Sequence, residues 1–194
     1  MDRKESTFGS MVITLLVVTA VAALALGYVH KITEEPIRKA QEAKLKKALK
    51  VVLPDFDTVS VEKVKAVDGA DSLIFYNAKK EGKYVGTAVK TYTNEGFSGH
   101  IDILAGFQPD GTIINTAVLK HSETPGLGDK MNADKSDFPL QFKGKNPENF
   151  KLYVTKDGGD VDAITAATIS SRAFCDAMRR AWKTFEKEGG KKDE

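Results

Sequence analysis

The 194-residue chain is predicted to have an α+β fold, with an N-terminal transmembrane helix, an amphipathic stalk, and an antiparallel sheet against which helices pack. Three observations lead to this prediction. Residues 11–29 form an uncharged apolar run, a series of strand patterns fills residues 59–155, and an amphipathic helix pattern closes the chain. Because few of the strands alternate with helices, an antiparallel sheet is expected rather than a parallel one.

The apolar run at residues 11–29 is predicted to be a membrane anchor. It contains Thr14 and Thr19 but no charged residue. At about 1.5 Å per residue, a helix of this length just crosses a hydrocarbon core of roughly 30 Å. A cleaved signal peptide is the alternative, since Ala23-Leu24-Ala25 resembles a cleavage site. The apolar run continues past that site to Val29, which favours a retained anchor.

A second helical pattern follows at residues 33–53, with apolar residues at helical spacing and Lys and Glu between them. Pro36 suits a first helical turn, and Leu53-Pro54 is expected to end the helix. This segment is interpreted as an amphipathic stalk. Its basic face either is solvated or contacts anionic lipid.

Strands are predicted from residues of alternating polarity, separated by turn residues. The predicted strands span residues 59–67, 72–77, 84–92, 100–107, 112–120 and 150–155. Residues 79–82 and 108–111 have the composition of tight turns. The closing helix is predicted from about residue 167 to residue 186, with one apolar face.

Composition excludes several classes of function. The net charge is +2 with both signs interspersed, so no basic field indicates nucleic acid. The single cysteine, Cys175, rules out an internal disulfide framework and a Cys-rich iron–sulfur or zinc site. Its apolar neighbours on the closing helix predict a buried, inert thiol. No metal-binding or catalytic motif is present in the sequence.

Two motifs carry chemical information. In the first, at residues 162–171, four hydroxyl side chains and Asp162 surround a predicted helix N-terminus, with Thr165 as the expected N-cap. Free backbone N–H groups and the helix dipole favour a phosphate there. In the second, at residues 121–130, Pro125-Gly126 fits a type II turn in which Gly126 has a positive φ. Gly128 adds a second permissive position, so the loop backbone can approach a planar ligand.

Read together and in this order, the two motifs resemble the FMN-binding domain of the Rnf and Nqr electron-transport complexes. In that family the flavin phosphate is esterified to the threonine that ends an Asp-x-x-(Ser/Thr)-Gly-Ala-Thr motif, which corresponds here to Thr168. Ala166 stands where the family has glycine, and a Cβ there narrows the room for close backbone approach. Gly96-Phe97-Ser98-Gly99 resembles the family's Gly-(Tyr/Phe)-x-Gly, which implies a second wall of the site; a β-bulge or tight turn explains it equally well.

The resemblance implies that the cofactor is FMN, covalently bound through its phosphate to Thr168, with no metal and no catalytic residue. The implied flavin-binding residues are Phe97, Glu123, Thr124, Pro125, Gly126, Leu127, Gly128, Asp162, Thr165, Ala166, Ala167 and Thr168.

Within the family, the chain is most similar to the G subunit of the ion-translocating Rnf complex. That complex passes electrons between ferredoxin and NAD and couples them to ion movement. The resemblance implies an electron-transfer subunit that is not a catalyst on its own, with other membrane subunits, a flavin transferase and membrane lipid as partners. The alternatives are the C subunit of a sodium-pumping NADH:quinone reductase and a stand-alone extracytoplasmic flavin carrier. An anchored binding module without a redox role is the competing class.

The resemblance also implies a location and a division of the chain. The expected location is a bacterial or archaeal plasma membrane, crossed once, with the N-terminus in the cytoplasm and the main domain outside. The expected segments are a cytoplasmic tail (1–10), the anchor (11–29), the stalk (30–54), the FMN-binding domain (55–188) and a charged tail (189–194).

Overall fold

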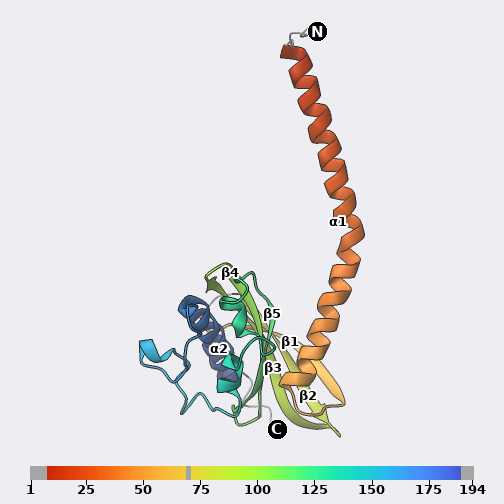
Figure 1. The fold of residues 1–194 in the computed structure, drawn as a ribbon. Helices are drawn as coiled ribbons and strands as arrows, with labels where there is room; N and C mark the ends of the chain where they lie inside the picture. The colour runs from red at the N-terminus through yellow and green to blue at the C-terminus, as the bar shows by residue number, and fades with distance from the viewer. Residues whose placement is uncertain (1–7, 69–70, 189–194) are drawn as a thin grey trace. The chain divides into compact units, whose positions relative to one another are not determined.

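The computed structural model describes residues 8–68 and 71–188, which divide between Ala43 and Lys44 into two compact units (Figure 1). Helix α1 (Phe8–Val52) lies in the first unit as far as Ala43, and its last turns, from Lys44 on, belong to the second unit. The second unit also contains a five-stranded antiparallel sheet, three short 3-10 helices and helix α2 (Thr168–Glu188). The predicted α+β fold is therefore confirmed. The predicted tail at 189–194 and residues 1–7 of the predicted tail at 1–10 lie outside the described residues.

Helix α1 contains the predicted anchor at residues 11–29. Helix α1 is long enough and apolar enough to cross a membrane. The Thr14 hydroxyl donates to the carbonyl oxygen of Ser10 at 2.8 Å, and the Thr19 hydroxyl donates to that of Leu15 at 2.9 Å. The helix thus satisfies its own polar side chains, as an apolar environment requires. By length and composition, α1 is a candidate membrane span.

The predicted start of a separate stalk helix near Thr33 is wrong. Thr33 lies inside α1, and its hydroxyl donates to the carbonyl oxygen of Val29 at 2.8 Å. Pro36 is likewise inside the helix and not in a first turn. Residues 28–35 contain neither glycine nor proline, so nothing interrupts the helix before Pro36. The proline ring then removes one backbone hydrogen bond, to the carbonyl of Ile32, without ending the helix.

The predicted end of the helix before Leu53-Pro54 is confirmed, because α1 ends at Val52. Its last turns pack on one face of the sheet. This smaller core cluster comprises Ala48, Leu49, Val52, Leu53, Tyr76, Ala78, Ala88 and Leu104. A Cβ at Gly106 would lie 1.7 Å from the carbonyl oxygen of Val52, so the helix end and the sheet approach each other at a position that only glycine allows.

The five strands pair in sequence order, each antiparallel to the next. They are β1 (Thr58–Lys65), β2 (Ser72–Lys80), β3 (Lys83–Gly96), β4 (Gly99–Phe107) and β5 (Ile113–Lys120). The turn predicted at residues 79–82 is a two-residue loop of Glu81 and Gly82, with φ of 51° and 78°. Both values are positive, as a type I′ hairpin loop requires. Five of the six predicted strands therefore exist.

The sixth predicted strand, at residues 150–155, is wrong. The segment pairs with its own continuation through an isolated bridge between Val154 and Val161 and then turns into the 3-10 helix η3 (Thr155–Asp157). The N–H group of Lys151 donates to a carboxylate oxygen of Asp160 at 2.7 Å. These local bonds satisfy the backbone groups that a strand would have offered to the sheet.

Helix α2 covers the other face of the sheet (Figure 1). Alternate residues of the strands point toward it and form the larger core; among them are Phe75, Val89, Ile101, Ile103 and Phe107, packed against Phe174, Met178, Ala181 and Phe185. The hydroxyl of Thr91 donates to the carbonyl oxygen of Ala177 at 3.1 Å, which fixes α2 along β3. Cys175 is fully buried in this core, as predicted, and burial raises the pKa of its thiol to about 12.

Candidate functional site

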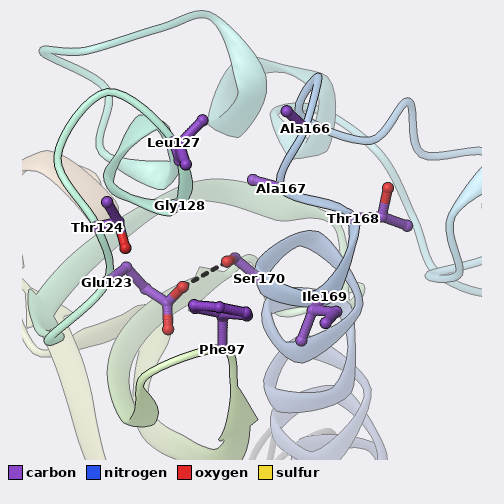
Figure 2. A pocket seen from close by; sticks show the side chains of 10 residues that line it. All are labelled: Phe97, Glu123, Thr124, Leu127, Gly128, Ala166, Ala167, Thr168, Ile169 and Ser170. Atoms are coloured by element: carbon purple, nitrogen blue, oxygen red, sulfur yellow. Dashed lines mark hydrogen bonds between the residues drawn. The ribbon is translucent and has the colours of Figure 1, made fainter.

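A cavity of about 310 Å³ lies where three segments of the second unit meet (Figure 2). The segments are the turn between β3 and β4, the loop that follows β5, and the start of α2. Asp102 of β4 pairs with Lys120 at the end of β5, which brings the loop after β5 beside the β3–β4 turn. The cavity is lined by Phe97, Glu123, Thr124, Leu127, Gly128, Ala166, Ala167, Thr168, Ile169 and Ser170.

Hydrogen bonds within the loop after β5 fix its conformation. The carbonyl oxygen of Thr124 accepts from the N–H group of Leu127 at 3.1 Å. Gly126 has a φ of 79°, so the predicted positive-φ turn is confirmed. The imidazole Nδ1 of His121 accepts from the N–H group of Glu123 at 3.1 Å and fixes the start of the loop. The exposed tip at Pro125 and Gly126 points outward, while Thr124 and Leu127 face the cavity.

Glu123 is the buried charged residue of the site, with 5% of its surface exposed. One carboxylate oxygen accepts from the N–H group of Ser98 in the β3–β4 turn at 2.9 Å. The other accepts from the hydroxyl of Ser170 on α2 at 2.5 Å, the bond drawn in Figure 2. A residue of the loop is thereby bonded to both other segments that line the cavity.

Two glycines make room for this carboxylate. A Cβ at Gly128 would lie 2.4 Å from Oε2 of Glu123 and 2.5 Å from the hydroxyl oxygen of Ser170. A Cβ at Gly96 would lie 2.7 Å from Oε1 of Glu123 and 2.4 Å from the carbonyl oxygen of Gly99. The Gly96–Gly99 motif is a tight hairpin turn, and it is also a wall of the cavity, since Phe97 lines it. The tight-turn interpretation is thus confirmed, and the assignment of this wall to a flavin site stays a prediction.

The segment before α2 is a turn and not a capped helix start. The carbonyl oxygen of Ile164 accepts from the N–H group of Ala167 at 3.0 Å, and α2 begins at Thr168. Thr165 is therefore not the N-cap; it lies exposed within this turn. Ser171 instead fastens the turn to the helix, because its hydroxyl oxygen accepts from the N–H group of Ile164 at 2.9 Å. Ala166 has a φ of 60° at the third position of the turn, where glycine is favoured.

Thr168 is half-buried at the first position of α2, and its side chain points away from Leu127 and Thr124 (Figure 2). Among the described residues, its hydroxyl has no hydrogen-bond partner. The first intrahelical bond runs from the N–H group of Ser171 to the carbonyl oxygen of Ala167, so the N–H groups of residues 168–170 lack helical partners. The start of α2 therefore combines a free hydroxyl with free backbone donors.

A cation lies one helical turn beyond Thr168. Residues four apart in a helix share a face, which places Arg172 on the side of Thr168. The Arg172 guanidinium donates to both carboxylate oxygens of Asp157 at 2.7 Å. These hydrogen bonds hold the pKa of Asp157 below its usual range and raise the pKa of Arg172.

The rim of the cavity is apolar and exposed. Phe97, Leu127 and Ile169, one from each segment, expose 68%, 41% and 48% of their surfaces. Single exposed apolar residues are common on proteins, but three around one cavity indicate a surface that a ligand or partner covers.

The structure brings most of the predicted site residues together and leaves four outside. Those that line the cavity are Phe97, Glu123, Thr124, Leu127, Gly128, Ala166, Ala167 and Thr168. Pro125, Gly126, Asp162 and Thr165 do not line it. The backbone of Asp162 is bonded instead to the side-chain amide of Gln141, at 2.8 and 3.1 Å. Sequence reasoning missed Ile169 and Ser170 as cavity residues, although their positions in the first turn of the predicted helix signalled both.

A family of known domains matches the region of the cavity, and known proteins match most of the chain. The pattern of the FMN-binding domain matches residues 96–183, which include all three segments that line the cavity. The G subunit of the ion-translocating oxidoreductase complex of Methanosarcina acetivorans is 37% identical, with 93% of this chain and 94% of the relative covered. The chain belongs to this G-subunit family. The corresponding G subunits of Vibrio atlanticus and Shewanella loihica are 34% and 33% identical, with 84–88% of each chain covered. The predicted resemblance is thus confirmed.

The geometry fits the FMN of this domain family in three respects. The apolar rim suits a flat aromatic ring. The free N–H groups at the start of α2 suit a phosphate. The hydroxyl of Thr168 lies beside those N–H groups without a partner of its own among the described residues.

Proposed function

We propose that this chain is a membrane-anchored flavoprotein that carries electrons within an Rnf-type complex, which couples electron transfer between ferredoxin and NAD to ion translocation. The observation that carries the proposal is the meeting of the three cavity segments within the region that matches the FMN-binding domain. The relatives are named as G subunits of an ion-translocating oxidoreductase complex, which favours this role over the C subunit of a sodium-pumping reductase or a stand-alone carrier. When bound, FMN supplies reversible electron uptake.

The FMN is proposed to be covalently attached through its phosphate to Thr168. The free hydroxyl of Thr168 and the unpaired N–H groups of the first helical turn support this assignment. The neighbouring hydroxyls are less suited. Those of Ser170 and Ser171 are buried and donate to Glu123 and to the carbonyl oxygen of Ala167. The ring would lie against Phe97, Leu127 and Ile169 in the cavity.

The chain is proposed to cross a plasma membrane once at residues 11–29, with residues 1–10 in the cytoplasm. Residues 30–54 would form the stalk, residues 55–188 the extracytoplasmic FMN-binding domain, and residues 189–194 a charged tail. The apolar, uncharged stretch of α1 supports the span. A covalent bond suits such a location, because a domain outside the cytoplasm cannot replace a flavin that dissociates. The bond also keeps the flavin at a high effective concentration near neighbouring redox centres.

The chain is proposed to act as an electron-transfer subunit without catalytic residues of its own. Its partners would be the other membrane subunits of the complex, membrane lipid, and a flavin transferase during maturation. In this proposal, Thr168 tethers the FMN, and the apolar side chains of the rim enclose its ring.

Denaturing gel electrophoresis under ultraviolet light tests the attachment, because only a covalent flavin stays on the unfolded chain. Full-length protein from cells that express a flavin transferase should give a fluorescent band. Thr168→Ala should abolish the band without loss of folded protein, measured by circular dichroism. Thr165→Ala is the matched control, since Thr165 is exposed in the turn, and this variant should keep its fluorescence. Fluorescence retained by Thr168→Ala, or a flavin mapped to Thr165, Ser170 or Ser171, would overturn the assignment.

A further inference from the structure

A buried carboxylate without a cation is the unusual feature of the cavity. Glu123 forms no ion pair with any Lys or Arg in the part of the chain that the structure describes. Its two oxygens accept from one N–H group and one hydroxyl, an arrangement suited to the ionised carboxylate, which only accepts hydrogen bonds. Burial of a charge is unfavourable unless hydrogen bonds compensate for the lost water. Packing alone therefore does not explain why a carboxylate occupies position 123.

We propose that Glu123 is the positioning residue of the flavin site: its carboxylate fastens the β3–β4 turn and the start of α2 to the loop after β5, and its negative charge keeps the midpoint potential of the bound flavin low. This inference rests on the proposed function, since it assigns a role toward the FMN that the function requires.

The positioning role follows from what each bonded segment carries. Ser98 adjoins Phe97, so the bond to Ser98 fixes the aromatic side of the cavity. Ser170 lies two residues after Thr168, so the bond to Ser170 fixes the start of α2 where the flavin is attached. Loss of the carboxylate would free both walls at once, because no other side chain in the described residues bonds the loop to both segments.

The electrostatic role follows from burial. Glu123 lines the cavity, so any ring that fills the cavity lies near the carboxylate. Each electron that arrives without a proton brings negative charge close to that of Glu123. In a medium of low dielectric the repulsion between the two charges is stronger than in water, and salt screens it little. Repulsion in the reduced state makes reduction less favourable, which lowers the midpoint potential.

Two substitutions separate the charge from the hydrogen bonds. Glu123→Gln removes the charge but keeps both contacts, because the amide oxygen can accept from Ser98 and the amide nitrogen can donate to the Ser170 hydroxyl oxygen. Glu123→Ala removes the charge and both contacts. Glu95→Gln is the matched control, since Glu95 is an exposed carboxylate on β3, two residues before Phe97.

The experiment is a spectroelectrochemical titration of full-length flavinylated protein in detergent, at low and at high salt, beside measurements of flavin content and thermal unfolding. Glu123→Gln should load flavin like the wild type and unfold at the same temperature, but with a more positive midpoint potential at both salt concentrations. Glu123→Ala should lose flavin content and unfold at a lower temperature. Glu95→Gln should leave the potential unchanged at high salt.

A wild-type potential in Glu123→Gln would overturn the electrostatic role, and wild-type flavin content and unfolding in Glu123→Ala would overturn the positioning role. Failure of the proposed function gives a different result, namely wild-type protein without flavin. In that case the unfolding temperatures still test the positioning role, because they require no flavin. A Thr168→Ala background provides the same comparison with the flavin deliberately absent.

Discussion

Ala166 has a backbone conformation that glycine adopts more easily, and this gives a prediction with a definite sign. Its φ of 60° lies in the left-handed region, which costs an L-residue about 1–2 kcal/mol. Ala166→Gly removes this cost. The substitution also makes the unfolded chain more flexible, which destabilises the fold by about 0.4–1 kcal/mol. Ala166 is exposed, so little packing is lost. The net expectation is a gain of about 0–1.6 kcal/mol in the free energy of unfolding, with a midpoint of about 0.8 kcal/mol.

Urea unfolding followed by tryptophan fluorescence measures this gain. Trp182 is the only tryptophan in the sequence and packs against Phe107 and Phe185 in the core, so its emission reports the folded domain. For a domain of this size, the gain corresponds to a rise in Tm of about 1–4 °C.

Ala133→Gly is the matched control. Ala133 is also an exposed turn residue, but its φ is not positive, so glycine relieves no strain there. This variant should lose about 0.4–1 kcal/mol. Equal destabilisation of both variants would show that Ala166 is not in the left-handed conformation and would refute the reasoning.

The remaining predictions concern the loop after β5 and the core. Gly126→Ala should cost only the strain of a positive φ, about 1–2 kcal/mol, because a Cβ there meets nothing within 4 Å. Gly128→Ala should cost more and reduce flavin content, because its Cβ would collide with Glu123; equal urea midpoints for the two variants would contradict this. Cys175 should resist iodoacetamide in the folded protein and react in denaturant, and equal labelling rates would show that the thiol is exposed. The pKa of the Cys175 thiol is about 12 in the folded protein and about 8.5 in the unfolded chain. The free energy of unfolding should therefore keep its full value below about pH 8.5 and fall as the pH rises from there to about 12.

Much of the fold could be predicted from the sequence, because local patterns determine it. Alternating polarity and turn residues identified five strands, and the apolar run identified the candidate membrane span. Two predictions of secondary structure were wrong. A residue pattern does not show which groups satisfy the backbone of a segment, or whether one helix continues into the next. The segment at residues 150–155 has a strand pattern, yet Asp160 and Val161 satisfy its backbone groups locally. The helix expected to start near Thr33 is continuous with the anchor, since no helix-breaking residue precedes Pro36.

The candidate site could be predicted in outline but not in its connections. The residue types around Thr168 and Gly126 indicated a phosphate and a close backbone approach. The bond between Glu123 and Ser170 joins residues 47 positions apart, and no local pattern signals such a contact. The sequence did not show that the turn before α2 has a positive φ at Ala166, which is a second reason for the family's glycine at this position.

The strand order explains why the three cavity segments meet. In an antiparallel sheet of consecutive strands, the start of β4 lies beside both the end of β3 and the end of β5. The β3–β4 turn and the loop after β5 must therefore leave the sheet at the same end of the strands. Helix α2 runs along β3, bonded through Thr91, and its N-terminus reaches that end of the sheet, where Ser170 donates to Glu123. The site thus depends on the register of β4 with both neighbours. A slip of one residue would turn the core side chains outward and separate the segments, so flavin binding and folding of this domain should be lost together.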